Sequence, residues 1–186
     1  NRGERFLSQW SCDLRNCRLQ ISDIEMTNIL LEISPRKGPG PNGVPGIFYK
    51  LFAKHVVPSF LEAFDELQRE NVRIPDSLGE RLWKVIPKVP GANTQAQLRD
   101  LEMPNEHRKV LARALARVLD EQASRTMSQC QHAFLRSRSI SNANVALGEG
   151  YYAANDRDVL RYWLLLDCTK GYNYLSWGWL TRVLTR

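Results

Sequence analysis

The sequence has no apolar run that approaches the roughly 18 consecutive residues of a membrane-spanning helix, and nothing in it resembles a signal peptide. Its four cysteines among 186 residues are too few and too scattered for a disulfide scaffold. Cys12 and Cys17 are not followed by a second ligand pair at zinc spacing. We therefore expect no membrane partner, no zinc motif and free thiols, which suit an intracellular reducing compartment (nucleus, cytoplasm or organelle).

The sequence also has few carboxylates near Asp167, its one candidate residue for metal chemistry. Residues 159–166 form an apolar run that is typical of a strand and that ends at Asp167. A turn of small residues and an amphipathic stretch, 175–184, come after it. Chemistry with two Mg²⁺ ions needs at least a second carboxylate nearby, and none follows in the sequence, which stops at Arg186.

What the sequence does contain fits one domain, or one domain with a small appendage. Its hydrophobic content of 43% is ordinary, and its net charge is +6. Seven basic residues stand against two acidic ones between Arg108 and Arg138, so most of the positive surplus lies in that segment. A local surplus of this kind indicates a phosphate-bearing partner, or else a solvated helix face.

The hydrophobic pattern predicts a helix-rich, mixed α/β (α+β) fold. Ser22 and Glu25 form a capping box for a helix that ends before Pro35. A long helical region is expected over 45–67, with Pro58 splitting it or starting its second half. Its buried side is expected to hold Phe48, Leu51, Phe52, Val56, Val57, Phe60, Phe64 and Leu67. Further helices are expected over 107–123 and 141–155, strands over 82–88, 98–103 and 159–166, and a tight loop over 38–43.

The helix over 107–123 carries its cations on a separate face from its apolar stripe. Lys109, Arg113 and Arg117 recur every four residues. Three cations in such a row are a plausible rail for a phosphate backbone, and a solvated face is the alternative.

Six short motifs follow one another in an order that is informative as a whole. The loop Lys37–Gly–Pro–Gly–Pro–Asn–Gly–Val–Pro45 precedes Phe48-Tyr49-Lys50. The later motifs are Ile86-Pro87-Lys88, Arg99, the helix from His107, the set Gln131, Phe134, Arg138, Ser139 and Ile140, and finally Asp167 with Lys170, Gly171, Tyr172 and Asn173. In this order and spacing, residues 21–184 resemble the reverse transcriptases of non-LTR (LINE-type) retrotransposons.

The resemblance implies part of a right-hand polymerase fold: the fingers subdomain plus the first palm strand and helix. It divides the chain into an N-terminal extension (1–20), a fingers-like region (21–158) and the start of a palm (159–186). Asp167 then matches the first catalytic, Mg²⁺-binding aspartate. Lys88 and Arg99 match fingers residues that contact the incoming triphosphate or the template, where cations offset phosphate charge.

Departures from the family pattern bear on activity. Asn42 and Asn173 stand where the family favours Asp, and Asp100 stands beside Arg99, where we expect its charge to weaken triphosphate binding. The Y/F-x-D-D hairpin with the second metal-binding carboxylate is absent from the sequence. We therefore expect this chain alone not to polymerise and to hold no bound cofactor, with Mg²⁺ only as part of a complete polymerase.

These observations lead to three hypotheses. The first is a degenerate, domesticated reverse transcriptase-like protein that binds RNA without catalysis within a ribonucleoprotein assembly. The second is a fragment of an active RNA-directed DNA polymerase, in which Asp167 is catalytic. The third is a structural subunit without direct nucleic-acid contact, in which a protein partner covers the edge of the truncated palm. The predicted nucleic-acid-binding residues are Lys37, Lys88, Arg99, Arg108, Lys109, Arg113, Arg117, Arg136 and Arg138.

Overall fold

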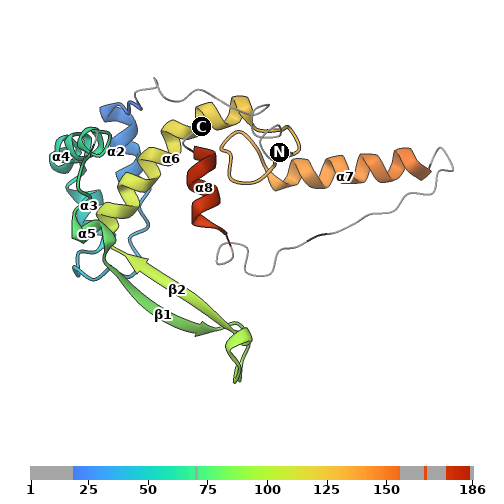
Figure 1. Cartoon of the computed structure of the whole chain (residues 1–186), viewed down its shortest axis with the longest axis horizontal. Helices are drawn as coiled ribbons and strands as arrows, with labels where there is room; N and C mark the ends of the chain where they lie inside the picture. The colour runs from blue at the N-terminus through green and yellow to red at the C-terminus, as the bar shows by residue number, and fades with distance from the viewer. Residues whose placement is uncertain (1–18, 70, 156–165, 167–174, 185–186) are drawn as a thin grey trace. The chain divides into compact units, whose positions relative to one another are not determined.

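The structure is a computed structural model, and it describes residues 19–69, 71–155, 166 and 175–184 (Figure 1). These residues belong to two compact units, Leu19–Leu119 and the described part of Asp120–Arg186. The strand predicted over 159–166, with Asp167 after it, lies outside the described residues apart from Leu166. Within the described ranges, no helix is long and apolar enough to cross a membrane.

Helices of the first unit pack around one apolar core. Helix α2 (Asp23–Leu31) begins with the predicted capping box, in which the Ser22 hydroxyl accepts the Glu25 N–H and the Glu25 carboxylate accepts the Ser22 N–H at 3.0 Å. It lies beside α4 (Ala53–Glu66) in Figure 1, and α6 (Glu106–Thr126) supplies the third side of the core. The buried core residues are Met26, Ile29, Leu30, Ile33, Ala53, Val57, Phe60, Phe64, Val110, Leu111 and Ala114.

The region 45–67 is helical, but its break is not where the sequence suggested. Helix α3 (Gly46–Leu51) gives way to α4 at Phe52, whose carbonyl accepts the N–H groups of His55 and Val56 and so starts the second helix. Pro58 lies inside α4. The predicted buried side is confirmed on α4 for Val57, Phe60 and Phe64. It was wrong before the turn at Phe52, where Phe48, Leu51 and Phe52 are exposed, Leu51 at 72%.

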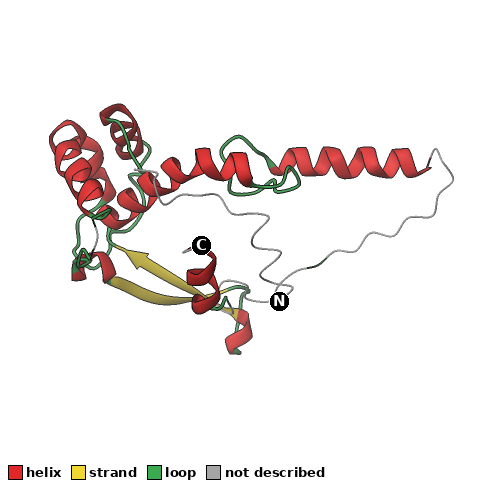
Figure 2. Ribbon diagram, turned by 45° about the horizontal axis from the view of Figure 1, so that its top comes forward, coloured by secondary structure: helices red, strands yellow, loops and turns green. Residues whose placement is uncertain are grey.

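A two-stranded antiparallel hairpin follows the short helix α5 (Asp76–Gly79). Strands β1 (Arg81–Pro87) and β2 (Leu98–Pro104) pair from Arg81↔Pro104 to Pro87↔Leu98, which confirms both predicted strands. A 3-10 turn (Gln95–Gln97) closes the tip. Figure 2 shows the hairpin projecting from the helices of its unit, and every residue of β1 is exposed.

The second unit contains two described helices, α7 (Ile140–Asn155) and α8 (Trp177–Leu184). The first confirms the helix expected over 141–155, and the second lies within the amphipathic stretch 175–184. The apolar side chains Val145, Tyr151 and Tyr152 on α7 are exposed. The chain is therefore helix-rich with one small antiparallel sheet among its described residues, which confirms the mixed fold class in its general form.

The tight loop over 38–43 is confirmed, and it packs against the start of α6. A Cβ atom at Gly40 would lie 2.6 Å from both the backbone N and the Cα of Asn105, a distance that backbone atoms cannot relieve. Gly43 has a φ of 71°, in the left-handed region that glycine tolerates without strain. The Asn42 side chain also accepts the Val44 N–H at 3.1 Å. Close packing thus requires glycine at position 40.

We predict that Gly40→Ala lowers the free energy of unfolding by about 1–3 kcal/mol, because the new methyl group must displace backbone at the start of α6. Gly38→Ala is the matched control, since nothing lies within 4 Å of a Cβ at that position. Urea unfolding followed by circular dichroism measures both variants. Equal stability of the two would contradict the packing described above.

Candidate nucleic-acid interface

The hairpin has one cationic face and one face that carries both of its acidic residues. Successive side chains of a strand point to opposite faces, and side chains paired across the register share a face. The first face therefore contains Leu82, Lys84 and Ile86 of β1, Lys88 directly after β1, and their neighbours Arg99, Leu101 and Met103 of β2. The second consists of Arg81, Trp83, Val85, Asp100 and Glu102.

The alternation also places Asp100 relative to Arg99. Asp100 pairs with Val85 and Arg99 pairs with Ile86, so the carboxylate and the guanidinium point to opposite faces of the hairpin. On the Asp100 face, Glu102 accepts a hydrogen bond from Arg81 at 2.9 Å. The two adjacent charges thus lie on opposite faces of the hairpin, and the face that carries Arg99 has no carboxylate.

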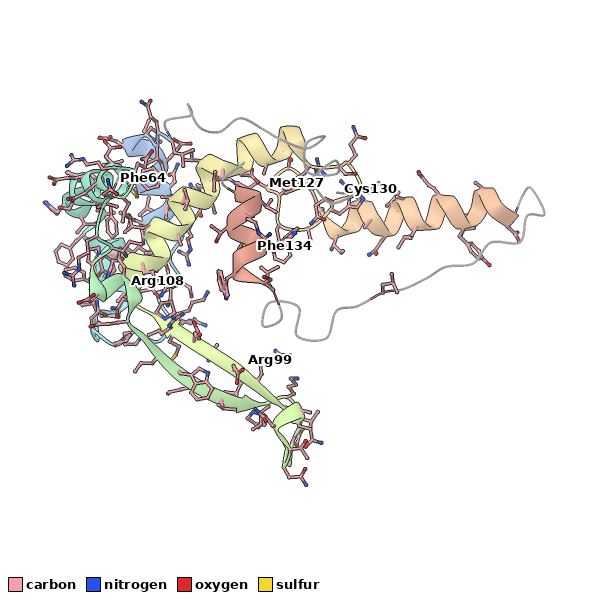
Figure 3. All side chains as sticks on the ribbon, in the orientation of Figure 1. Phe64, Arg99, Arg108, Met127, Cys130 and Phe134 are labelled. Atoms are coloured by element: carbon pink, nitrogen blue, oxygen red, sulfur yellow. The ribbon has the colours of Figure 1, made fainter. Side chains whose placement is uncertain are left out.

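Two of the predicted binding residues, Lys88 and Arg99, lie together on the cationic face. Figure 3 shows Arg99 on the hairpin, away from the helices of its unit. Lys88 donates to the carbonyl of Ala96 at 2.9 Å, which uses one of the three N–H groups of its ammonium. Among the described residues, Lys84 and Arg99 have neither an ion pair nor a side-chain hydrogen bond. The face therefore retains N–H donors for an anionic ligand.

Sequence reasoning missed Lys84 as a member of this set. The signal was available in the alternation of 82–88, because Lys84 and Lys88 are four residues apart and so share a face of an extended strand. Arg99 could be added only with the pairing register, which the sequence alone does not fix. Trp83, which is 66% exposed on the other face, was also missed.

Two of the three cations predicted to form a row on α6, Lys109 and Arg117, form ion pairs within the protein. Lys109 lies 2.6 Å from the buried carboxylate of Glu106. Arg117 pairs with Glu32, donates to the carbonyl of Glu25 at 3.4 Å, and is only 13% exposed. These two cations join α6 to its own first turn and to α2. Arg113 is the remaining member, and it is half-buried.

The other predicted cations stand on three different segments of the chain. Lys37 is exposed in the segment before the tight loop, and Arg108 is half-buried at the start of α6, as Figure 3 shows. Arg136 is exposed on the loop between α6 and α7. Arg138 is used by that same loop, where its guanidinium donates to backbone carbonyls. The structure therefore gathers the predicted cations into one surface only at the hairpin.

Asn105 connects the root of the hairpin to the tight loop. Its fully buried side chain accepts the Asn42 N–H at 3.0 Å and donates to the carbonyl of Ser77 at 3.0 Å and to Glu80 at 3.5 Å. Because β2 ends at the residue before Asn105, and β1 starts just after Glu80, these bonds fix both strands at the base of the hairpin.

Glu106 and Tyr49 lie next to this junction. Burial raises the pKa of the Tyr49 hydroxyl above its ordinary value of 10.0, the charge of Glu106 raises it further, and the hydrogen bond with the Asn42 side chain opposes the change. Glu106 is 1% exposed, and its Oε2 atom has no hydrogen-bond partner among the described residues. The Glu106 side chain is therefore a second buried polar group, next to Asn105 in the sequence.

Two apolar hollows of about 430 and 340 Å³ lie on either side of Leu78 and Leu111 in the same unit. Arg81 and Arg108 line the first, and His107 lines the second. No carboxylate lines either hollow. Such walls suit apolar groups and bring together no set of groups for acid–base or metal chemistry.

Across the described ranges, no cluster of three or more His, Cys, Asp or Glu side chains could hold a metal ion. Asp167, the residue expected to bind Mg²⁺, lies outside those ranges. A comparison of the chain with protein-family models finds no match.

We predict that Asn105→Ala destabilises the protein by about 1–3 kcal/mol, because it removes the two part-buried hydrogen bonds that the Asn105 side chain makes with the Asn42 N–H and the Ser77 carbonyl. Asn28→Ala, at an exposed position on α2, is the control. Thermal or urea unfolding distinguishes them. A loss no larger in Asn105→Ala than in Asn28→Ala would remove Asn105 from its proposed role.

Tyr49 predicts a loss of stability in alkali. Its pKa is raised in the folded protein, so its contribution to stability is complete below pH 10 and falls as the pH rises above that value. Tyr49→Phe is expected to have a shallower decline of unfolding free energy above pH 10 than the wild type. The comparison requires urea unfolding at several alkaline pH values, and identical slopes would contradict the burial of the hydroxyl.

Proposed function

We propose that this chain is a reverse transcriptase-derived RNA-binding protein that acts without catalysis as a component of a ribonucleoprotein assembly. The observation that carries the proposal is the cationic face of the hairpin, with Lys84, Lys88 and Arg99 on a surface that has no carboxylate. A phosphate backbone suits such a face, because ordered cations displace its counterions.

The geometry of the hairpin supports a nucleic-acid ligand over a small anion. Along β1 the positions of Lys84 and Lys88 are four residues apart, about 13 Å at roughly 3.3 Å per residue. That separation spans more than one phosphate of an extended strand. Leu82, Ile86 and Leu101 share this face with the cations and offer apolar contact to sugars and bases.

Two sequence observations support the ancestral part of the proposal. The six motifs stand in the order that the non-LTR reverse transcriptases have, and Lys88 and Arg99 match fingers residues of that family. Asn173 stands where the family motif often ends in Asp, which favours binding without polymerisation. In the same comparison, Asp167 is a residual catalytic position.

We predict that the triple variant Lys84→Gln, Lys88→Gln, Arg99→Gln weakens binding of single-stranded RNA and reduces its salt dependence. Each phosphate contact contributes about 0.7 to the slope of log K against log salt for single strands, so three lost contacts reduce the slope by about 2. Fluorescence anisotropy with labelled RNA at several salt concentrations measures both quantities.

The matched control is Lys54→Gln, Arg69→Gln, Arg73→Gln, which removes the same charge from exposed positions outside the hairpin. If both triple variants change affinity and slope equally, net charge alone explains the binding and the hairpin interface is wrong. If the wild type binds no RNA, the proposed function is wrong as a whole.

A further inference from the structure

The loop between α6 and α7 is held in one shape by Arg138. The Arg138 guanidinium donates to the carbonyls of Ser124, Met127, Ser128 and Gln131, with 2.7 Å for the bond to Gln131. Three of these carbonyls lie in or directly after the last turn of α6, where backbone acceptors lack partners within the helix. The arginine therefore joins the end of the helix to the loop.

Further bonds fix the second half of the loop. The Arg136 N–H donates to Asp120 at 3.1 Å, and the Arg138 N–H donates to the carbonyl of Leu135 at 3.0 Å. Leu135 is buried, at 9% exposure, so it anchors the loop by apolar packing as well.

Phe134, the residue before this anchor, is directed outward. Its φ is 65°, in the left-handed region that a bulky side chain rarely adopts, and 89% of its surface is exposed (Figure 3). Both features are unfavourable for an isolated protein, since the backbone is strained and a ring remains in water. Strain of this kind persists only where the surrounding bonds impose it, and it is frequent at ligand sites.

We propose that Phe134 is a stacking platform for an unpaired base of the bound RNA. The inference rests on the proposed RNA binding and adds a second contact of a different chemistry. An aromatic ring next to a cation is the combination that single-stranded nucleic acids select, because bases stack on the ring while the cation meets the backbone. Arg136 is that cation: its side chain is exposed two residues along, while Arg138 holds the loop.

The test separates stacking from phosphate contact by its two probes. Labelled oligoadenylate and an abasic oligonucleotide of equal length carry the same phosphates, but only the first carries bases. Phe134→Asn removes the ring and places a residue that tolerates the left-handed conformation. We expect this variant of the full chain to bind oligoadenylate about tenfold or more weakly and to bind the abasic probe as the wild type does.

Two further variants complete the design. Phe134→Tyr keeps an aromatic ring and is expected to retain oligoadenylate affinity. Tyr152→Asn removes another exposed aromatic of the same unit, on α7, and is expected to change neither affinity. Unfolding of Phe134→Asn is measured in parallel, and we expect its stability to equal or exceed that of the wild type because the strain at position 134 is relieved.

Three outcomes would overturn the proposal. If Phe134→Asn binds both probes as the wild type does, the ring has no role in binding and the stacking proposal is wrong. The proposed RNA binding is still supported in that case if the hairpin triple variant loses affinity. Equal weakening toward both probes would indicate a change of loop structure instead of lost stacking. A wild-type chain that binds neither probe would overturn both this inference and the proposed function.

Discussion

The arrangement of the first unit depends on the buried side chain of Asn105. An amide enclosed among protein atoms must satisfy its donors and its acceptor within the protein, and Asn105 does so through the tight loop, the end of α5 and Glu80. The close approach of Gly40 makes room for it. An exposed two-stranded hairpin has little stability of its own, so the orientation of its cationic face depends on this fixed base.

The sequence predicted the parts that depend on local rules. The capping box at Ser22, the two strands of the hairpin, the long helix α6 and the helix over 140–155 follow from side-chain spacing and from hydrogen bonds between near neighbours. The break at Phe52 did not follow, because Pro58 is the stronger local signal, and the core contacts of α4 allow this proline within the helix. Tertiary packing there outweighs propensity.

The cationic face of the hairpin contains two of the residues predicted from the sequence, Lys88 and Arg99, and one that was not predicted, Lys84. Lys109, Arg117 and Arg138 have the same chemistry as Lys88 and Arg99 in the sequence, yet they face Glu106, Glu32 and a set of backbone carbonyls. These partners lie up to 85 residues away along the chain. A charge count over residues 108–138 therefore overstates the cations that remain for a ligand, and only the fold separates the two groups.

Each of the two proposed contacts with RNA depends on a backbone that a bonded polar side chain holds in place within its own unit. At the hairpin, alternation along each strand directs Arg99 away from Asp100, and the Asn105 bonds hold the base of both strands. On the loop after α6, the Arg138 guanidinium donates hydrogen bonds to backbone carbonyls. On the same loop, Phe134 has a strained φ and its ring is directed into solvent. Asn105 thus orients the exposed cations of the hairpin, and Arg138 orients the exposed ring of Phe134. Arg138 thus contributes to the proposed RNA contact indirectly, without touching RNA. Its loss is expected to change the position of the Phe134 ring.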